Sequence, residues 1–326
     1  MDPYQNVGLF PALKRAPVAQ NQRFSYPAIA RDPNADSAVV GSSVARLLKT
    51  SRLNESLGSR FVNLAMNDAT PLEQRKMLRL FLRYHPDARY LVFAIDDGWC
   101  HESAERREYT VRGFPSFMYD ESEWNDVFYL FNDKALENSV RMLELLTGKR
   151  EPKYGRDGYD DFSSDPADRH LPTVRARIYG SPDPVRLPTK TIDLEPAHTR
   201  PETPMAELSR LHALLSKVPE SSRAILIFPP MHGWQLLQNA EHYRECKVRA
   251  LQIASAHPNV AVLDFMLDGD LVRRDENFLD RIHYVDEVAR ELERVLGDVY
   301  RGHVPQEPWA RVRKRGHWMK PEQISR

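Results

Sequence analysis

The architecture of this chain can be read outward from Ala38-Val39-Val40-Gly41-Ser42-Ser43. Three apolar residues end at a glycine and two serines, and Val44, Leu47 and Leu48 follow at helical spacing. This order predicts a buried strand, a tight turn and a helix. In an open α/β sheet ligands bind just outside the carboxyl ends of the strands. The serine turn therefore lies where a functional site is expected.

The same rhythm recurs along the chain. Apolar runs typical of buried strands occupy residues 61–66, 90–95, 224–228 and 260–265, and helical patterns occupy residues 71–84, 205–215, 240–256 and 285–296. Thr70 and Pro71 fit the N-cap and first position of one of these helices. Strands that alternate with helices predict a parallel sheet with right-handed crossovers. We expect a three-layer α/β/α, doubly wound, flavodoxin-like domain of about five strands.

The regions outside this rhythm set the predicted boundaries. Residues 1–35 are rich in proline, asparagine and arginine, which predicts an extended arm, and residues 36–300 form the α/β domain. Residues 96–204 are expected to be a loop-rich insertion with one helix near 136–146. Residues 301–326 form a basic tail, whose Arg311–Arg315 cluster is interpreted as a solvated surface, with membrane contact as a minor alternative.

Composition excludes several classes of function. The 326 residues carry 46 basic and 46 acidic side chains, so no global field favours nucleic acid as a partner. The sequence contains no dinucleotide fingerprint, P-loop, HExxH or EF-hand loop, and we expect neither a cofactor nor a metal. Cys100 and Cys246 have no zinc-ligand spacing, and whether they pair is left open. No run of 18 apolar residues occurs, although an anchor upstream of the given sequence remains an open alternative.

Polar residues of functional types follow each predicted strand. They are Ser43, Asn67, Asp96 and Asp97, His232, Asp264, and after a short excursion Asp280 and His283. Since parallel strands end at one edge of the sheet, these side chains are expected to converge there. We predict that Asp96, Asp97 and His232 contact the substrate.

Ser43, His283 and Asp280 together suit nucleophilic catalysis. A serine hydroxyl needs a base to take its proton and donors to stabilise the oxyanion that forms. The three-residue spacing from Asp280 to His283 allows the carboxylate to orient the imidazole. The free N–H groups and the helix dipole at Ser43 favour an oxyanion there, and Asn67 is the second expected donor.

Each of these residues also has a purely structural interpretation. A Gly-x-Ser after a strand often forms a turn, and Asp280 could simply cap a helix. His232 could be a satisfied structural histidine, and Asp96 with Asp97 could merely begin the insertion. A metal site formed by Asp264, Asp280, His283 and His232 lacks a recognised ligand spacing. The joint placement of serine, acid and histidine favours catalysis.

Two blocks of sequence resemble the SGNH (GDSL-like) hydrolase superfamily. They are Gly41-Ser42-Ser43, where Ser43 matches the nucleophile, and residues 278–284, where Asp280 and His283 match the DxxH block. Residues 62–66, 227–232 and 263–265 are similar to envelope-associated bacterial members, so the resemblance covers about residues 36–300. Where the superfamily has a block-two glycine and Gly-x-Asn-Asp, this chain has Met66-Asn67-Asp68 and Ala94-Ile95-Asp96-Asp97.

The resemblance implies acyl-ester chemistry in the bacterial periplasm or cell envelope. Members include esterases and proteins that transfer acyl groups to cell-surface polysaccharides, often tethered by an N-terminal membrane helix that the given sequence lacks. The first hypothesis is a serine hydrolase or O-acyltransferase acting on a carbohydrate or glycan ester. The alternative, favoured by the two altered blocks, is a catalytically weak or inactive protein of this fold that binds a glycan or a partner in polysaccharide assembly.

Overall fold

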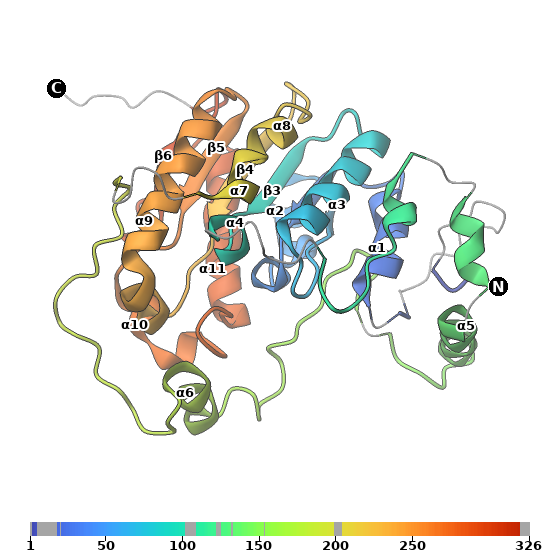
Figure 1. Cartoon of the computed structure of the whole chain (residues 1–326), viewed down its shortest axis with the longest axis horizontal. Helices are drawn as coiled ribbons and strands as arrows, with labels where there is room; N and C mark the ends of the chain where they lie inside the picture. Colours follow the sequence, from blue (N-terminus) through green and yellow to red (C-terminus); the bar gives the residue numbers. More distant parts are fainter. Residues whose placement is uncertain are drawn as a thin grey trace.

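A mostly parallel sheet forms the centre of the molecule (Figure 1). The computed structural model describes residues 2–4, 18–19, 21–101, 109–121, 125–131, 133–152, 154–198 and 204–319. Its strands are β1 (Ser37–Val40), β2 (Phe61–Asn63), β3 (Tyr90–Ala94), β4 (Arg223–Phe228), β5 (Val260–Asp264) and β6 (Arg311–Lys314), in the spatial order β2-β1-β3-β4-β5-β6. The first five are parallel and follow the flavodoxin-like order 2-1-3-4-5. The α/β class and the five predicted strands are thus confirmed, and a sixth strand is added.

Burial on both faces of the sheet explains why the strands could be predicted from apolar runs in the sequence. Every residue of β1, β2 and β5 is buried, as expected for a parallel sheet covered on both faces. The described helices are α1 (Gln22–Ala30), α2 (Thr50–Leu57), α3 (Pro71–Tyr84), α4 (Asp97–Cys100), α5 (Asp133–Leu146), α6 (Leu171–Tyr179), α7 (Ala206–Ser209), α8 (Leu211–Leu215), α9 (Gly233–Ser255), α10 (Asp270–Arg273) and α11 (Asp286–Tyr300). Helix α2 packs against α11, while α3 lies over β1 and α9 lies over β5.

Two predicted boundaries change in the structure. Within the predicted N-terminal arm, residues 22–30 form α1, which Asn21 caps and which contacts α3. Pro27 inside α1 masked its helical pattern in the sequence. Residues 1, 5–17 and 20 of the arm lie outside the described residues. In the predicted basic tail, β6 pairs antiparallel with β5, and its charged residues suit a solvated edge strand.

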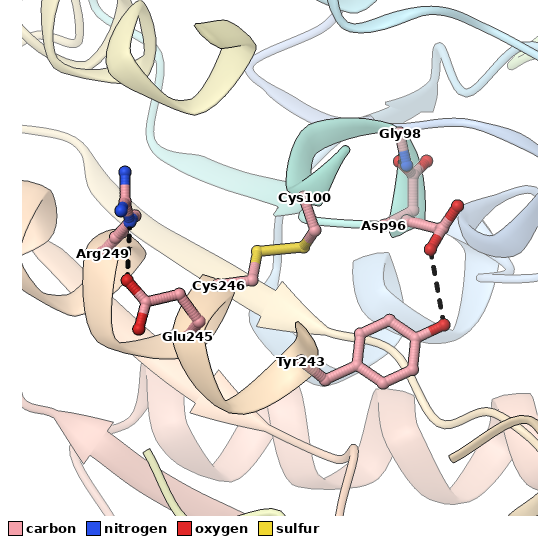
Figure 2. Close-up of a disulfide and its surroundings, with 8 residues drawn as sticks. Asp96, Gly98, Cys100, Tyr243, Glu245, Cys246 and Arg249 are labelled. Carbon is pink, nitrogen blue, oxygen red and sulfur yellow. Dashed lines mark hydrogen bonds and ion pairs between the residues drawn. A yellow bond between two sulfur atoms is a disulfide. The ribbon is translucent and has the colours of Figure 1, made fainter. Parts of the chain in front are cut away.

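The insertion contains more structure than one helix. The predicted helix near 136–146 is present as α5, and residues 96–204 also hold α4, α6 and the short 3₁₀ helices η2 (Ser116–Tyr119) and η3 (Asn125–Leu130). Helix α4 is tied to α9 by the disulfide Cys100–Cys246, which settles the pairing that the sequence left open (Figure 2). The insertion is therefore fastened covalently to the α/β core.

Three helices differ in their limits from the sequence expectation. A 3₁₀ turn, η1 (Ser43–Ala45), follows the serine turn, and α2 begins only at Thr50. The helix expected at 205–215 is divided into α7 and α8 at Arg210. Helix α9 begins at Gly233 instead of near 240 and is interrupted by the non-helical backbone of Asn239. Among the described residues, no helix is long and apolar enough to cross a membrane.

Candidate active site

A continuous chain of hydrogen bonds joins the three residues of the expected triad. Ser43 Oγ lies 2.7 Å from His283 Nε2, and His283 Nδ1 lies 2.7 Å from Asp280 Oδ2. With Nδ1 protonated, the imidazole donates to the carboxylate and accepts the serine proton through Nε2. The structure thus brings Ser43, which follows β1, together with Asp280 and His283. In the sequence, His283 lies 240 positions from Ser43.

Asp280 is held in its charged form by its own turn. Its Oδ1 accepts hydrogen bonds from the backbone N–H groups of Ile282 and His283, both at 2.9 Å. Burial alone would raise the pKa of Asp280, but the hydrogen bond and charge attraction of His283 with these N–H groups lower it below its usual value. A carboxylate that stays ionised near neutral pH can orient His283 and stabilise its imidazolium.

The loop that carries His283 is braced on both sides. Leu279 N–H donates to the His283 carbonyl at 2.8 Å, and Tyr284 donates its hydroxyl to the carbonyl of Val44 next to the nucleophile. His232 N–H donates to the Arg281 carbonyl at 2.9 Å. These contacts fix the backbone of the histidine loop relative to the serine turn.

The turn at Ser43 leaves one backbone N–H group free among the described residues. Ser43 is the first residue of η1, and among the described residues its backbone N–H has no hydrogen-bond partner. A three-residue 3₁₀ turn has little macrodipole, so the helix-dipole contribution expected from the sequence is replaced by this single free N–H. A side chain at Gly41 would meet Ala45 Cβ at 2.8 Å and Ala94 Cβ at 3.0 Å, which explains the glycine.

Asn67 lies on the neighbouring loop. Met66 N–H donates to the Gly41 carbonyl at 3.1 Å, so the loop after β2 runs beside the serine turn. The Asn67 side chain makes no hydrogen bond to any described residue, Ser43 included. Its carboxamide is thus uncommitted, and its predicted role as an oxyanion donor stays a prediction.

Asp96 is a buried partner of the serine turn. It is buried, accepts a hydrogen bond from the Gly98 N–H at 2.9 Å and from Gln74 Nε2 at 3.3 Å, and is also hydrogen-bonded to the Ser42 side chain. Burial raises its pKa, although these hydrogen bonds oppose the shift. The structure therefore gives Asp96 a supporting position instead of the exposed one that direct substrate contact requires.

Asp97 and His232 also receive partners. Tyr243 donates to Asp97 Oδ1 at 3.4 Å, and Asp97 remains partly exposed. His232 is fully buried, accepts from the Trp234 N–H at 3.1 Å as the N-cap of α9, and lies 3.3 Å from Asp275. Burial lowers its pKa, which keeps the ring neutral. Burial and the cap agree with the structural interpretation of His232, but its buried Nε2 has no hydrogen-bond partner among the described residues. Asp97 stays a candidate for substrate contact.

The sequence did not single out Phe162 and Arg46 as parts of the site. The Phe162 ring packs edge-on against His283 with 5.5 Å between the centroids, and the Arg46 guanidinium lies 4.8 Å from the Phe162 centroid. Arg46 also forms an ion pair with Asp160. The insertion thus forms one wall of the site. The sequence indicated only a loop-rich insertion here, and nothing in its pattern indicated where it would pack.

The metal alternative receives no support from the geometry. Asp264 is buried and pairs at 2.9 Å with both Lys247 and Arg313, away from a ligand role. Among the described residues, no group of three or more histidine, cysteine, aspartate or glutamate side chains could hold a metal ion.

Comparison with known proteins adds no assignment. Neither a scan against protein-family models nor a search of the curated proteins finds a match to this chain. The chemistry of the site must therefore be inferred from its own geometry.

Proposed function

We propose that this chain is an SGNH-type serine hydrolase or O-acyltransferase that acts on acyl esters of carbohydrate or cell-envelope glycan. The observation that supports it most is the unbroken sequence of hydrogen bonds from Ser43 through His283 to Asp280. Structural turns and helix caps seldom place a hydroxyl, an imidazole and a carboxylate in this order. The carbohydrate or glycan part of the proposal rests on the sequence resemblance alone.

The proposed reaction follows from the geometry. Ser43 Oγ attacks the ester carbonyl while its proton passes to His283 Nε2, and the imidazolium is stabilised by Asp280. The oxyanion accepts hydrogen bonds from the Ser43 N–H and from the Asn67 carboxamide. His283 then gives the proton to the leaving alkoxide, so the acyl group remains on Ser43. Water or a second hydroxyl, deprotonated by His283, removes the acyl group and regenerates the serine.

The compartment is part of the same proposal. The disulfide Cys100–Cys246 has both residues buried, and structural disulfides persist in oxidising compartments. This supports a location in the bacterial periplasm or cell envelope, where the glycan esters named above occur. The resemblance also implies tethering to the membrane through a segment outside the given sequence.

A specific observation favours the alternative function. Asp96 and Asp97 stand where the superfamily offers an oxyanion asparagine, and a carboxylate near a developing oxyanion opposes it. A non-catalytic protein of this fold would keep the triad geometry but bind a glycan or partner without turnover. The free Ser43 N–H and the uncommitted Asn67 carboxamide favour the enzyme over the non-catalytic alternative.

Hydrolysis of aryl esters and of O-acetylated polysaccharide tests the proposal. Acetyl, butyryl and octanoyl esters are compared on wild type, Ser43→Ala, His283→Ala and the exposed control Ser51→Ala. We expect turnover in wild type and Ser51→Ala and its loss in the other two variants. Addition of a sugar acceptor separates acyl transfer from hydrolysis by the ratio of products. Glycan binding by folded wild type without any turnover would favour the alternative.

A further inference from the structure

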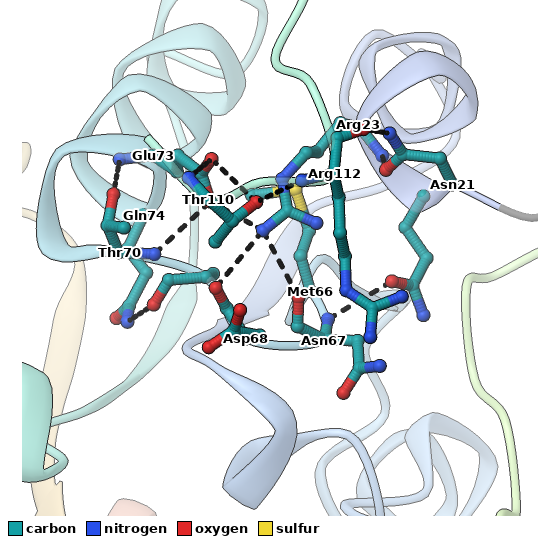
Figure 3. A network of polar contacts seen from close by, with 12 residues as sticks. Asn21, Arg23, Met66, Asn67, Asp68, Thr70, Glu73, Gln74, Thr110 and Arg112 are labelled. Carbon is teal, nitrogen blue, oxygen red and sulfur yellow. Dashed lines mark hydrogen bonds and ion pairs between the residues drawn. The ribbon is translucent and has the colours of Figure 1, made fainter. Parts of the chain in front are cut away.

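Two side chains of α1 hold Asn67 from opposite sides. Gln22 Oε1 accepts the Asn67 N–H at 3.0 Å, and Arg23 Nη2 donates to the Asn67 carbonyl at 3.1 Å and to the Asp68 carbonyl at 3.2 Å (Figure 3). Both peptide groups around Asn67 are thus fixed by a helix from the N-terminal segment. Its side chain is the one part of Asn67 that this contact set leaves free.

Arg23 is itself fixed by a buried ion pair. Its Nη2 lies 2.5 Å from Glu73 Oε2 in α3, and both side chains are fully buried. Glu73 also completes the capping box with Thr70 and accepts the Thr110 N–H from the insertion at 3.1 Å. The guanidinium therefore connects α1, α3 and the insertion to the loop that carries Asn67.

Stability alone does not explain this network. Arg23 Nε and Nη1 are buried with no hydrogen-bond partner among the described residues, and a buried ion pair rarely stabilises more than an apolar substitute. The loop that it holds is strained as well. Asp68 is the only non-glycine residue described with a positive φ, at 54°. Such strain persists where the surrounding structure imposes it, and it clusters at functional sites.

We propose that Arg23 is a positioning residue that pre-organises Asn67 as the second oxyanion donor of the site. The loop of Met66, Asn67 and Asp68 adjoins the serine turn through the bond from Met66 to Gly41. Arg23 touches neither the substrate nor the triad. It acts by fixing the backbone from which the Asn67 carboxamide extends. This inference rests on the proposed hydrolase or acyltransferase function.

A double-mutant cycle with Asn67→Ala tests the inference. The double variant Arg23→Met/Glu73→Gln removes both buried charges together. The glutamine at position 73 can still serve in the capping box with Thr70. We expect the rate of fluorophosphonate labelling and the affinity for a boronic acid, which mimics the tetrahedral intermediate, to fall about 10- to 100-fold. In the Asn67→Ala background the same substitutions are expected to cause no further loss, because their effect passes through Asn67.

Two further readouts separate positioning from general damage. The urea midpoint of Arg23→Met/Glu73→Gln and the NMR titration of His283 are expected to match wild type, and Arg79→Met on the exposed face of α3 serves as the matched control. Should the double variant fail to fold, Arg23→Lys, which keeps the charge, is expected to retain partial labelling. Losses that add fully to those of Asn67→Ala, or a wild-type labelling rate, would overturn the inference. Wild type that is not labelled at all would remove the proposed function, and the inference with it.

Discussion

At the scale of single residues, Asp280 has the most closely defined task. It accepts two backbone N–H groups through one oxygen and His283 through the other. Asp280→Asn keeps the shape but reverses the preferred histidine tautomer, so we predict a fall in kcat of about 10³-fold or more. Ester hydrolysis measures it, with the exposed Asp270→Asn as the control. A loss of less than tenfold would show that His283 does not need this partner.

His232 sets a second prediction, on the pH dependence of stability. Burial lowers its pKa in the folded state below the unfolded value of about 6.5. Its contribution to stability is therefore present above pH 6.5 and is lost as the pH falls through the folded pKa. We predict that His232→Asn, which keeps the helix cap, loses less unfolding free energy between pH 7.5 and pH 5 than wild type does.

Urea unfolding at several pH values measures this difference. The exposed His303→Asn serves as the control for the loss of a histidine. If His232→Asn and wild type lose the same free energy on acidification, His232 does not titrate as its burial requires.

The triad was readable from the sequence because each of its parts has a local signal. Ser43 follows a strand and a glycine, and Asp280 and His283 are three residues apart. The roles of Asp96 and His232 depend on burial, which no local pattern reports. Phe162 reaches His283 only through the packing of an insertion without periodicity, so no sequence signal could have placed it.

At the scale of elements, Gly158 allows the insertion to approach the sheet closely. Its φ is +84°, and a Cβ there would lie 2.1 Å from the Asn63 carbonyl oxygen. Gly180 has nearly the same φ, +81°, but open space around it. We predict that Gly180→Ala costs about 1 kcal/mol of unfolding free energy for its conformation. Gly158→Ala is expected to cost at least about 2 kcal/mol more because of the added clash.

Urea unfolding separates these two terms. Because residues 159–162 lead to Phe162, Gly158→Ala is also expected to reduce labelling of Ser43, whereas Gly180→Ala is not. Equal losses of stability in the two variants would mean that the segment moves away from β2 without cost.

The disulfide Cys100–Cys246 also holds two elements together, since it joins α4 to α9. Cys100 and Cys246 are 146 residues apart and both buried. We predict that Cys100→Ala/Cys246→Ala lowers the unfolding free energy by about 2–5 kcal/mol. Urea unfolding checks this, and reductant is expected to leave the variant unchanged. Reaction of native wild type with a thiol reagent in the absence of reductant would contradict the pairing.

The elements that the sequence predicted correctly are those with strong periodicity. Each of the five parallel strands contains an apolar run, and α3 carries its cap and proline at the predicted positions. The strand β6 was missed because Arg311-Val312-Arg313-Lys314 is charged and lies at the solvated edge. Helix α1 was missed because its stabilising contacts, such as the ion pair of Arg23, are made with distant segments.

At the scale of the whole molecule, the site is assembled from the beginning, middle and end of the chain. The serine turn follows β1, the histidine precedes α11, the insertion supplies Phe162 and α1 holds the loop of Asn67. The sheet order brings these segments to one edge, since the nucleophile strand β1 lies between β2 and β3.

An activated Ser43 is the central claim, and covalent labelling with a fluorophosphonate tests it most directly. Intact-protein mass spectrometry follows labelling of wild type, Ser43→Ala, His283→Ala and Ser51→Ala, and fragmentation of tryptic peptide 32–46 distinguishes Ser42 from Ser43. The account predicts one label on Ser43 in wild type and Ser51→Ala, none in Ser43→Ala, and much slower labelling in His283→Ala. Folded wild type that takes up no label, or takes it up equally in Ser43→Ala, would contradict the account.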